Sequence, residues 1–247
     1  MKTKAAASSS TSPISETDVI ILCGGLGTRL RAVVSDRPKP MARVGDKPFL
    51  EILIDHFAAR GLRRFILCAG YKAGSITEYF KNSSDRTFVF SQETEPLGTA
   101  GALKLCESKR ESQTALVLNG DSFCAVDPAA LLALHAQKKA AATLSAVAEE
   151  KRADGGTLNI APDGRVTAFR EGFYEGRERF INAGVYAFGQ QVFDAIAAGT
   201  PCSLEKEILP RLLDSGVYAY VTGEKLYDIG TPERLETFQK ISPRNSF

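Results

Sequence analysis

Three glycines and two cations follow the first apolar run of the chain. Residues 19–23 form a short apolar run rich in β-branched side chains, which favours a buried strand over a helix. The next segment, G-G-x-G at residues 24–27, can turn its backbone N–H groups toward an anion, because glycine tolerates positive φ and close ligand approach. Arg29 and Lys39 add two fixed positive charges, and Lys39 is held between two prolines. This combination predicts a site for nucleotide phosphates.

Two better-known phosphate motifs do not fit these residues. The dinucleotide fingerprint G-x-G-x-x-G is absent because the glycines stand as G-G-x-G. The P-loop is absent because no lysine follows the last glycine. The glycines alone also fit an ordinary turn between a strand and a helix, so that alternative stays open.

Short apolar runs alternate with amphipathic stretches along the rest of the chain. Strands are expected at residues 64–69, from 89, and at 115–119, 143–148, 156–160, 165–169, 185–188 and 217–221. Helices are expected at residues 49–60, 73–80, 99–106, 128–139, 203–213 and 232–240. The alternation predicts an α/β fold with a mostly parallel central sheet and a small antiparallel β excursion. Ligands of such sheets bind beyond the carboxyl ends of the strands, where the glycine segment and the residues after Asn119 fall.

Taken together, these motifs resemble the signature of the sugar-1-phosphate nucleotidyltransferases. In that family G-G-x-G-T-R-L is followed by P-K-P-M, as at residues 24–30 and 38–41. Similar segments recur at residues 95–101 (E-P-L-G-T-A-G), 182–184 (N-A-G) and 227–232 (Y-D-I-G-T-P). The resemblance implies a Rossmann-like three-layer αβα sandwich. It also implies an enzyme that joins a nucleoside triphosphate to a sugar 1-phosphate and releases pyrophosphate.

The resemblance also implies site residues. For the nucleotide they are Leu22, Gly24, Gly25, Gly27, Thr28, Arg29, Glu93, Pro96, Gly98, Thr99, Asn119 and Asp121. For the sugar phosphate they are Lys39, Gly120, Glu171, Asn182, Ala183, Gly184 and Asp228. Catalytic roles fall to Arg29, Lys39 and Asp121, and Asp121 with Asp228 would hold Mg²⁺, which prefers hard oxygen ligands. Considered singly, Thr99, Asp121 and Asn182 also fit capping or turn positions.

Base choice is expected to depend on Glu93. A carboxylate there can accept hydrogen bonds from both N1–H and the N2 amino group of guanine, whereas uracil and thymine offer one such donor.

One departure from the family pattern concerns the sugar phosphate. The family usually has Glu-Lys before N-A-G, and here Glu171 is followed by Gly172. Arg170, Arg177 and Arg179 are the candidates for the missing charge, although arginine does not match lysine geometrically.

Within the family, the chain most resembles the D-glycero-α-D-manno-heptose-1-phosphate guanylyltransferases, which make GDP-heptose for bacterial surface polysaccharides such as capsule, lipopolysaccharide or S-layer glycan. The D-K-P-F-L-E segment at residues 46–51 supports that subgroup. The alternatives are mannose-1-phosphate guanylyltransferases, glucose-1-phosphate thymidylyl- or uridylyltransferases, and a MurNAc-1-phosphate uridylyltransferase. An alternative of another class is a catalytically inactive nucleotide-sensing regulatory subunit.

Composition limits the other partners and the compartment. The net charge of +2 gives no general attraction to nucleic acid or membrane, so GTP and a sugar 1-phosphate remain the expected partners, with a homodimer left open. Five dispersed cysteines without a C-x-x-C pattern indicate reduced thiols and a cytoplasmic protein. We expect His56 and His135 to be surface or packing residues. A polar leader is expected over residues 1–18, a single catalytic domain over 19–240 and a tail over 241–247.

Overall fold

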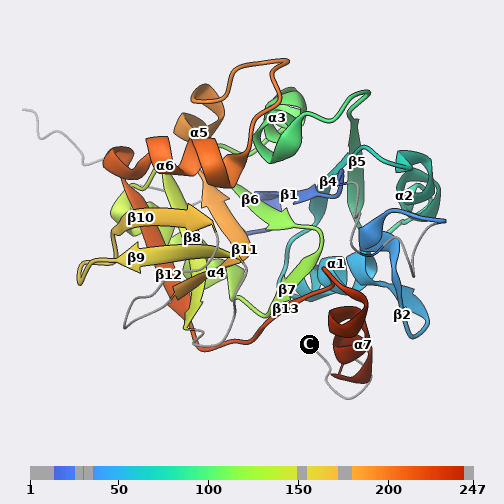
Figure 1. Ribbon diagram of the computed structural model, residues 1–247. Helices are drawn as coiled ribbons and strands as arrows, with labels where there is room; N and C mark the ends of the chain where they lie inside the picture. Colours follow the sequence, from blue (N-terminus) through green and yellow to red (C-terminus); the bar gives the residue numbers. More distant parts are fainter. Residues whose placement is uncertain (1–13, 26–29, 31–35, 149–154, 172–179, 242–247) are drawn as a thin grey trace, which may run out of the picture.

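A nine-stranded sheet forms the centre of the molecule. The structure, a computed structural model, describes residues 14–25, 30, 36–148, 155–171 and 180–241. Within these residues the strand order is β10-β9-β11-β6-β1-β4-β5, and β8 joins β11 to β12 (Figure 1). The strands are β1 (Asp18–Leu22), β4 (Arg64–Ala69), β5 (Thr87–Gln92), β6 (Ala115–Asn119), β8 (Ala142–Ala148), β9 (Gly156–Ile160), β10 (Val166–Glu171), β11 (Phe180–Phe188) and β12 (Val217–Thr222).

The sheet divides into a parallel and a largely antiparallel part. Strands β6, β1, β4 and β5 are parallel, so their carboxyl ends share one edge. Strand β11 runs antiparallel to β6, β8 and β9, and β9 pairs antiparallel with β10. The α/β class is confirmed, while the antiparallel part is larger than the single hairpin that the sequence predicts.

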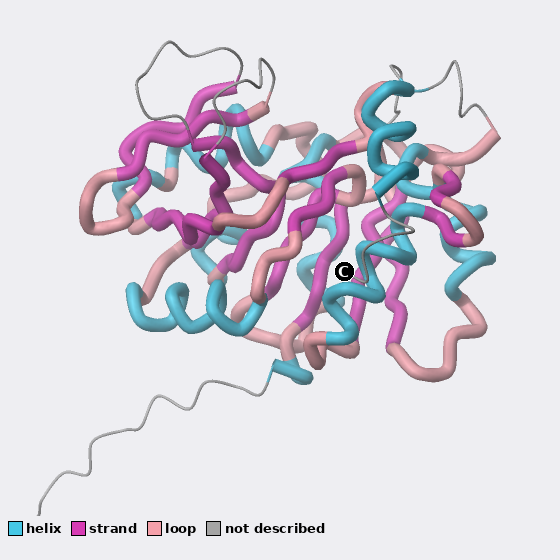
Figure 2. Tube along the Cα trace, turned by 90° about the horizontal axis from the view of Figure 1, so that it is seen from below, coloured by secondary structure: helices cyan, strands magenta, loops and turns pink. Residues whose placement is uncertain are grey.

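Helices cover both faces of the sheet, which confirms the three-layer sandwich (Figures 1 and 2). They are α1 (Phe49–Ala59), α2 (Ala73–Phe80), α3 (Gly98–Cys106), α4 (Pro128–Lys138), α5 (Gln190–Asp194), α6 (Leu209–Arg211) and α7 (Pro232–Ile241). Side chains of α1, α2, α4 and α7 share one buried cluster, and those of α3, α5 and α6 share the other. Alternation along β1 supplies both clusters, because Val19 and Ile21 enter the first and Ile20 enters the second.

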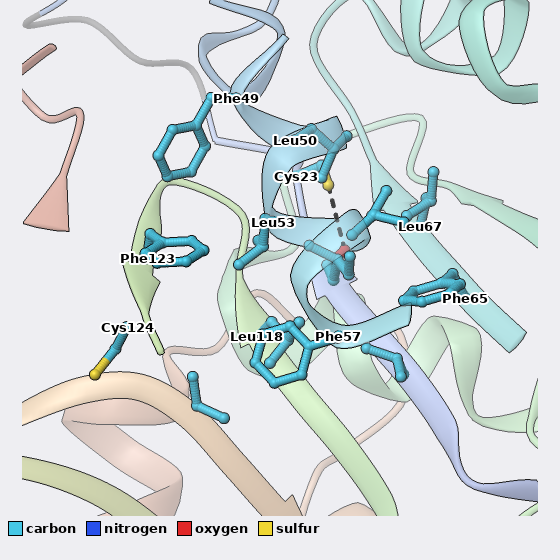
Figure 3. Close-up of a cluster of buried hydrophobic side chains, with 14 of the residues drawn as sticks. Cys23, Phe49, Leu50, Leu53, Phe57, Phe65, Leu67, Leu118, Phe123 and Cys124 are labelled. Atoms are coloured by element: carbon cyan, nitrogen blue, oxygen red, sulfur yellow. Dashed lines mark hydrogen bonds between the residues drawn. The ribbon is translucent and has the colours of Figure 1, made fainter. Parts of the chain in front are cut away.

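The cluster beneath α1 fixes the helix against the parallel strands. Leu53 and Phe57 of α1 are buried beside Phe65 of β4 and Leu118 of β6 (Figure 3). Full burial of one such side chain stabilises the fold by about 2 kcal/mol. Helix α7 joins the same cluster through Phe238, whose ring centroid lies 5.0 Å from that of Phe49 on α1.

The end of β1 away from the glycine segment is held by a buried carboxylate. Asp18 is fully buried and accepts hydrogen bonds from the backbone N–H groups of Glu111 (2.6 Å) and Ser112 (2.7 Å). It also forms an ion pair with Arg64. Asp18, the last residue of the expected leader, is therefore the first residue of β1 instead.

Two predicted elements differ from the structure. The helix expected over residues 203–213 is broken into a π-helical turn (Leu204–Ile208), the short α6 and a 3₁₀ turn (Leu213–Ser215). Pro210 has no N–H to donate, and the preceding turn widens so that the N–H of Ile208 bonds to Ser203. Two short ribbons do not follow from the periodicity: β2 (Arg43–Val44) with β3 (Lys47–Pro48), and β7 (Ser122–Cys124) with β13 (Leu226–Asp228).

Both histidines are packing residues, and both are buried. The rings of His56 and Phe123 meet edge to face at 5.0 Å, and Nδ1 of His135 lies 3.1 Å from Oγ1 of Thr143. Across the described residues, no helix combines the length and the apolar character needed to cross a bilayer.

Candidate active site at the carboxyl edge of the sheet

The carboxyl ends of β1 and β6 meet at Gly120. Its N–H donates to the carbonyl of Leu22 at 3.0 Å. A β-carbon on residue 120 would lie only 2.6 Å from that carbonyl oxygen, so the position requires glycine. This contact brings Asp121 beside Cys23 at the start of the glycine segment. Burial, together with the charge of Asp121, raises the pKa of the Cys23 thiol, which therefore stays neutral and is no nucleophile.

Lys39 and Asp121 form an ion pair at this edge. Lys39 begins a 3₁₀ turn (Lys39–Met41) that Pro38 precedes and that buries Pro40 and Met41. Its Nζ lies 2.6 Å from Oδ2 of Asp121, and 11% of the lysine side chain is exposed against 43% of the aspartate side chain. The structure thus joins two sequence-predicted residues that are 82 positions apart.

Asp228 reaches the same place through the β7–β13 ribbon. Strand β13 pairs Asp228 with Ser122, and the N–H of Ile229 donates to the Asp121 carbonyl at 3.0 Å. Oδ1 of Asp228 accepts from the N–H of Gly230 at 2.8 Å and from Nη1 of Arg234 at 3.1 Å. The two aspartates predicted as metal ligands are therefore neighbours, and each is paired with a cation.

These aspartates are compatible with a shared Mg²⁺ ion. Among the described residues, no group of three or more histidine, cysteine, aspartate or glutamate side chains forms a metal cluster. Mg²⁺ commonly uses one or two protein carboxylates and completes its shell with water and substrate phosphates. Asp121 and Asp228 supply that number and kind of ligand.

Glu93 lies against the glycine segment. Its N–H donates to Ala69 at the end of β4, and its Oε2 accepts from the N–H of Leu97 at 3.1 Å. The other oxygen, Oε1, would lie 2.5 Å from a β-carbon on Gly24 and 2.3 Å from one on Gly70, so two glycines make room for this carboxylate. Burial raises the pKa of Glu93, and the Leu97 N–H partly offsets the shift.

The N-A-G segment lies inside β11 rather than in a turn before it. The register of β11 against β8 shifts between Asn182 and Tyr186, and Gly184 takes a φ of +74° at this bulge. A β-carbon on Gly184 would lie 3.1 Å from the Asn119 amide nitrogen. The buried Tyr186 hydroxyl accepts from Nδ2 of Asn182 (2.7 Å) and of Asn119 (3.5 Å). One phenol therefore orients two predicted ligand-binding amides.

Thr99 is engaged away from the glycine segment. Its hydroxyl donates to Glu205 and accepts from the N–H of Leu204, each at 2.8 Å, so it ties α3 to the π-helical turn. Helix α3 begins at Gly98, whose φ of +71° and contact with the Cys202 carbonyl both require glycine. Thr99 is thus not the N-cap considered from the sequence.

The remaining predicted residues are distributed as follows. Leu22 ends β1, Gly25 has open space on its β-carbon side, Pro96 is exposed and Ala183 is buried in the core. Glu171 ends β10, and its side chain is outside the description; Arg170 is exposed. Gly27, Thr28, Arg29, Gly172, Arg177 and Arg179 lie outside the described residues.

Sequence reasoning missed Arg234 and Tyr186. Arg234 lies in the first turn of α7, where the helix dipole disfavours a cation, and this position is a signal that the side chain has an anionic partner. Tyr186 lies in an apolar strand, so nothing local distinguishes it from a core aromatic residue.

Comparisons with known proteins place the chain in a family. A family model described as Nucleotidyl transferase matches residues 18–243. D-glycero-alpha-D-manno-heptose 1-phosphate guanylyltransferase of Aneurinibacillus thermoaerophilus is 36% identical over 225 residues, which cover 90% of this chain and 97% of that protein. Mannose-1-phosphate guanylyltransferase of Mycobacterium tuberculosis is also 36% identical, over 88% of this chain but only 62% of its own length.

A solved structure extends the likeness to the fold. The crystal structure of HddC from Yersinia pseudotuberculosis superposes with a TM-score of 0.79 at 33% identity, covering 91% of this chain and 98% of that one. The same protein has also been solved in complex with GMP-PN.

Proposed function

The chain belongs to the nucleotidyl transferase family, and we propose that it joins GTP to D-glycero-α-D-manno-heptose 1-phosphate, giving GDP-heptose and pyrophosphate. The single observation that carries the proposal is the meeting of Lys39, Asp121 and Asp228 at the carboxyl edge of the parallel strands. A cation and two carboxylates at that edge suit the binding of two phosphorylated substrates, and the reaction needs no covalent protein nucleophile.

The proposed reaction is a direct displacement. A phosphate oxygen of the sugar 1-phosphate forms a bond to the α-phosphorus of GTP while the bond from that phosphorus to the bridging oxygen of pyrophosphate breaks. Catalysis then consists of positioning and charge neutralisation. Lys39 bridges the two reacting phosphates, and the glycine segment with Arg29 holds the β- and γ-phosphates. Asp121 and Asp228 would hold Mg²⁺, which would supply further positive charge.

Guanine preference is assigned to Glu93. The carboxylate beside Gly24 and Gly70 has two lone-pair-bearing oxygens for the N1–H and N2 amino donors of guanine. The HddC complex with GMP-PN supports a guanine nucleotide, since this chain resembles that protein over nearly its whole length. The relatives named as guanylyltransferases support the same base.

The choice of sugar is carried by similarity to the heptose enzymes. The relative from Aneurinibacillus thermoaerophilus matches along 97% of its length, whereas this chain spans 62% of the mannose enzyme. Mannose 1-phosphate remains the second candidate because the identity is equal. Asn182 and Gly184, with Asn119 behind them, are the residues that we assign to the sugar.

The cellular location and the biosynthetic role follow from the proposed reaction. We propose a cytoplasmic enzyme that supplies GDP-heptose for a bacterial surface polysaccharide, alone or as a homodimer. All five cysteines are free, and such reduced thiols suit a reducing compartment. The alternative of a nucleotide-sensing subunit without catalysis is disfavoured by the intact Lys39–Asp121 pair.

Pyrophosphate release from a substrate panel tests the proposal. Purified protein with Mg²⁺ would receive GTP, ATP, UTP or dTTP, each with the heptose, mannose or glucose 1-phosphate. We expect GTP with the heptose 1-phosphate to give the highest kcat/KM. A higher kcat/KM with mannose 1-phosphate would replace the sugar assignment, and no release from any pair would favour the regulatory alternative.

A further inference from the structure

Three charged side chains converge on Gly230, and one of them, Arg234, has no role in the reaction proposed above. A β-carbon built on Gly230 would lie 2.7 Å from Oδ1 of Asp228 and 3.7 Å from both Nη1 of Arg234 and Nζ of Lys39. Two cations therefore approach the same point from different segments, Lys39 from its 3₁₀ turn and Arg234 from α7. This point lies beside the two aspartates.

Asp228 holds Arg234 with both carboxylate oxygens. Nη1 of Arg234 lies 3.1 Å from Oδ1 and 3.2 Å from Oδ2. The carboxylate is mostly buried, with 11% of its side chain exposed, whereas 35% of the Arg234 side chain is exposed. The arginine can therefore move into solvent or onto a ligand more easily than the aspartate can move.

We infer that Arg234 is a substrate-binding residue that contacts the phosphate of the sugar 1-phosphate. Before the substrate binds, the ion pair with Asp228 keeps the Arg234 guanidinium at the site. This inference rests on the proposed function. A metal ion held by Asp228 would bring its positive charge close to the Arg234 guanidinium, and like charges at short separations repel strongly in a partly buried site. Arg234 and the metal ion therefore compete for Asp228, and the guanidinium, when displaced, turns to the nearest new anion.

The sugar phosphate is that anion because of where Arg234 lies. We assign the nucleotide phosphates to the glycine segment that follows β1, whereas Arg234 pairs with Asp228 and approaches the same point beside Gly230 as Lys39. Lys39 already bridges both substrates in the proposed reaction. A guanidinium offers paired N–H donors that match two phosphate oxygens, which an ammonium group does not.

The first experiment compares the Arg234→Gln protein with wild type in two binding measurements. Mn²⁺ binding without substrates is followed by the electron paramagnetic resonance signal of the free ion, and we expect Arg234→Gln to bind Mn²⁺ several-fold more tightly. Binding of mannose 1-phosphate, the second candidate substrate, which carries the same 1-phosphate group, is measured by calorimetry with Mg²⁺ and a non-hydrolysable GTP analogue present. Its Kd should rise about tenfold or more, as for loss of one charge-assisted contact, while the Kd of the GTP analogue changes less than twofold.

Control variants separate this role from general charge and from folding. Lys240→Gln removes one cation from the same helix, where Lys240 pairs with Glu236 on the exposed face, and should change neither constant. Arg234→Lys keeps the charge without the fork and should bind mannose 1-phosphate with a Kd between those of wild type and Arg234→Gln.

The outcomes that overturn the inference are distinct from failure of the proposed function. Weaker Mn²⁺ binding by Arg234→Gln would show that Arg234 supports the metal site instead of competing for it. An unchanged mannose 1-phosphate Kd would remove the phosphate contact. Both measurements are made without turnover, so a wild-type protein that forms no sugar nucleotide would refute the proposed function and still allow the Arg234 result to be decided.

Discussion

Glu93 is the residue on which the proposed base preference depends. Its carboxylate is fitted against two glycines from different strand ends, and its pKa is raised by burial. We expect Glu93→Gln to lower the ratio of kcat/KM for GTP over UTP by about tenfold to a hundredfold, since an amide cannot accept with both groups. Glu95→Gln, an exposed change two residues away, is the matched control and should leave the ratio unchanged.

The same residue predicts a pH effect with a definite sign. As pH falls through the raised pKa of Glu93, the carboxylate takes up a proton and loses an acceptor, so the preference for GTP declines. The ratio measured in Glu93→Gln should be flat over that range. A wild-type ratio that stays constant with falling pH, or a Glu93→Gln protein that prefers GTP as strongly as wild type, would contradict the assignment.

Secondary-structure elements with a strong local pattern were predictable from the sequence. Strand β4 and helix α1 have nearly the predicted bounds because apolar periodicity and Gly61, with a φ of +97°, define them locally. The β7–β13 ribbon was not predictable from periodicity, since each strand has three residues and the pairing joins segments about a hundred residues apart. The meeting of Asp121 and Asp228 followed only from family resemblance.

The bulge in β11 is a second feature that could not be predicted from the sequence. Asn182 and Gly184 suggest a turn by composition, yet the chain continues as a strand through them because β8 pairs on both sides of the bulge. The Tyr186 hydroxyl that orients Asn119 and Asn182 depends on that distortion. Residue types were thus readable from the sequence, whereas the contacts between elements were not.

Strand β1 carries a stability determinant at the end opposite the site. Asp18 is buried with Arg64 and the N–H groups of Glu111 and Ser112. We expect Asp18→Asn to lower the free energy of unfolding by about 3 kcal/mol, because it breaks a buried ion pair, while kcat well below the melting temperature is unchanged. Urea unfolding and the pyrophosphate assay measure the two quantities.

Glu111→Gln is the control for this change. The Glu111 side chain is 72% exposed and pairs with Arg64 from the surface at 3.0 Å. Removing its charge should therefore lower the free energy of unfolding by less than about 1 kcal/mol. Equal losses of unfolding free energy in the two variants would contradict the role given to the buried Asp18. A large loss of kcat in Asp18→Asn would show that the two ends of β1 are not independent.

The whole fold should lose stability in mildly acidic solution because both of its histidines are buried. Burial lowers the pKa of His56 and His135 to about 4, from ordinary values near 6.5. Between these values the unfolded chain binds more protons than the fold, so the free energy of unfolding falls as pH falls. Each histidine contributes up to about 1.4 kcal/mol per pH unit. Urea unfolding at pH 7 and pH 5 tests this.

The chain has only two histidines, so one double variant removes the effect. A His56→Gln, His135→Gln protein should be less stable at pH 7 but lose much less stability between pH 7 and pH 5 than wild type. Equal stability of the wild-type protein at the two pH values would contradict the burial of these rings as neutral groups.

In the molecule as a whole, one edge of the sheet stabilises the fold and the opposite edge carries the candidate active site. One edge anchors β1 through Asp18, and the other gathers Lys39, Asp121, Asp228 and Arg234. The parallel strands give that second edge its position, and the β7–β13 ribbon completes it.

The most direct test of this account is the kcat of Lys39→Met with GTP, the heptose 1-phosphate and Mg²⁺, compared with Lys47→Met. Lys47 is a half-exposed lysine that pairs with Asp55 and Glu51 instead of with Asp121 or Asp228. We predict that Lys39→Met lowers kcat on the order of 10²-fold or more with the fold retained, as for loss of one preorganised charge, and that Lys47→Met stays within about twofold of wild type. A folded Lys39→Met protein with near-normal kcat would contradict the account.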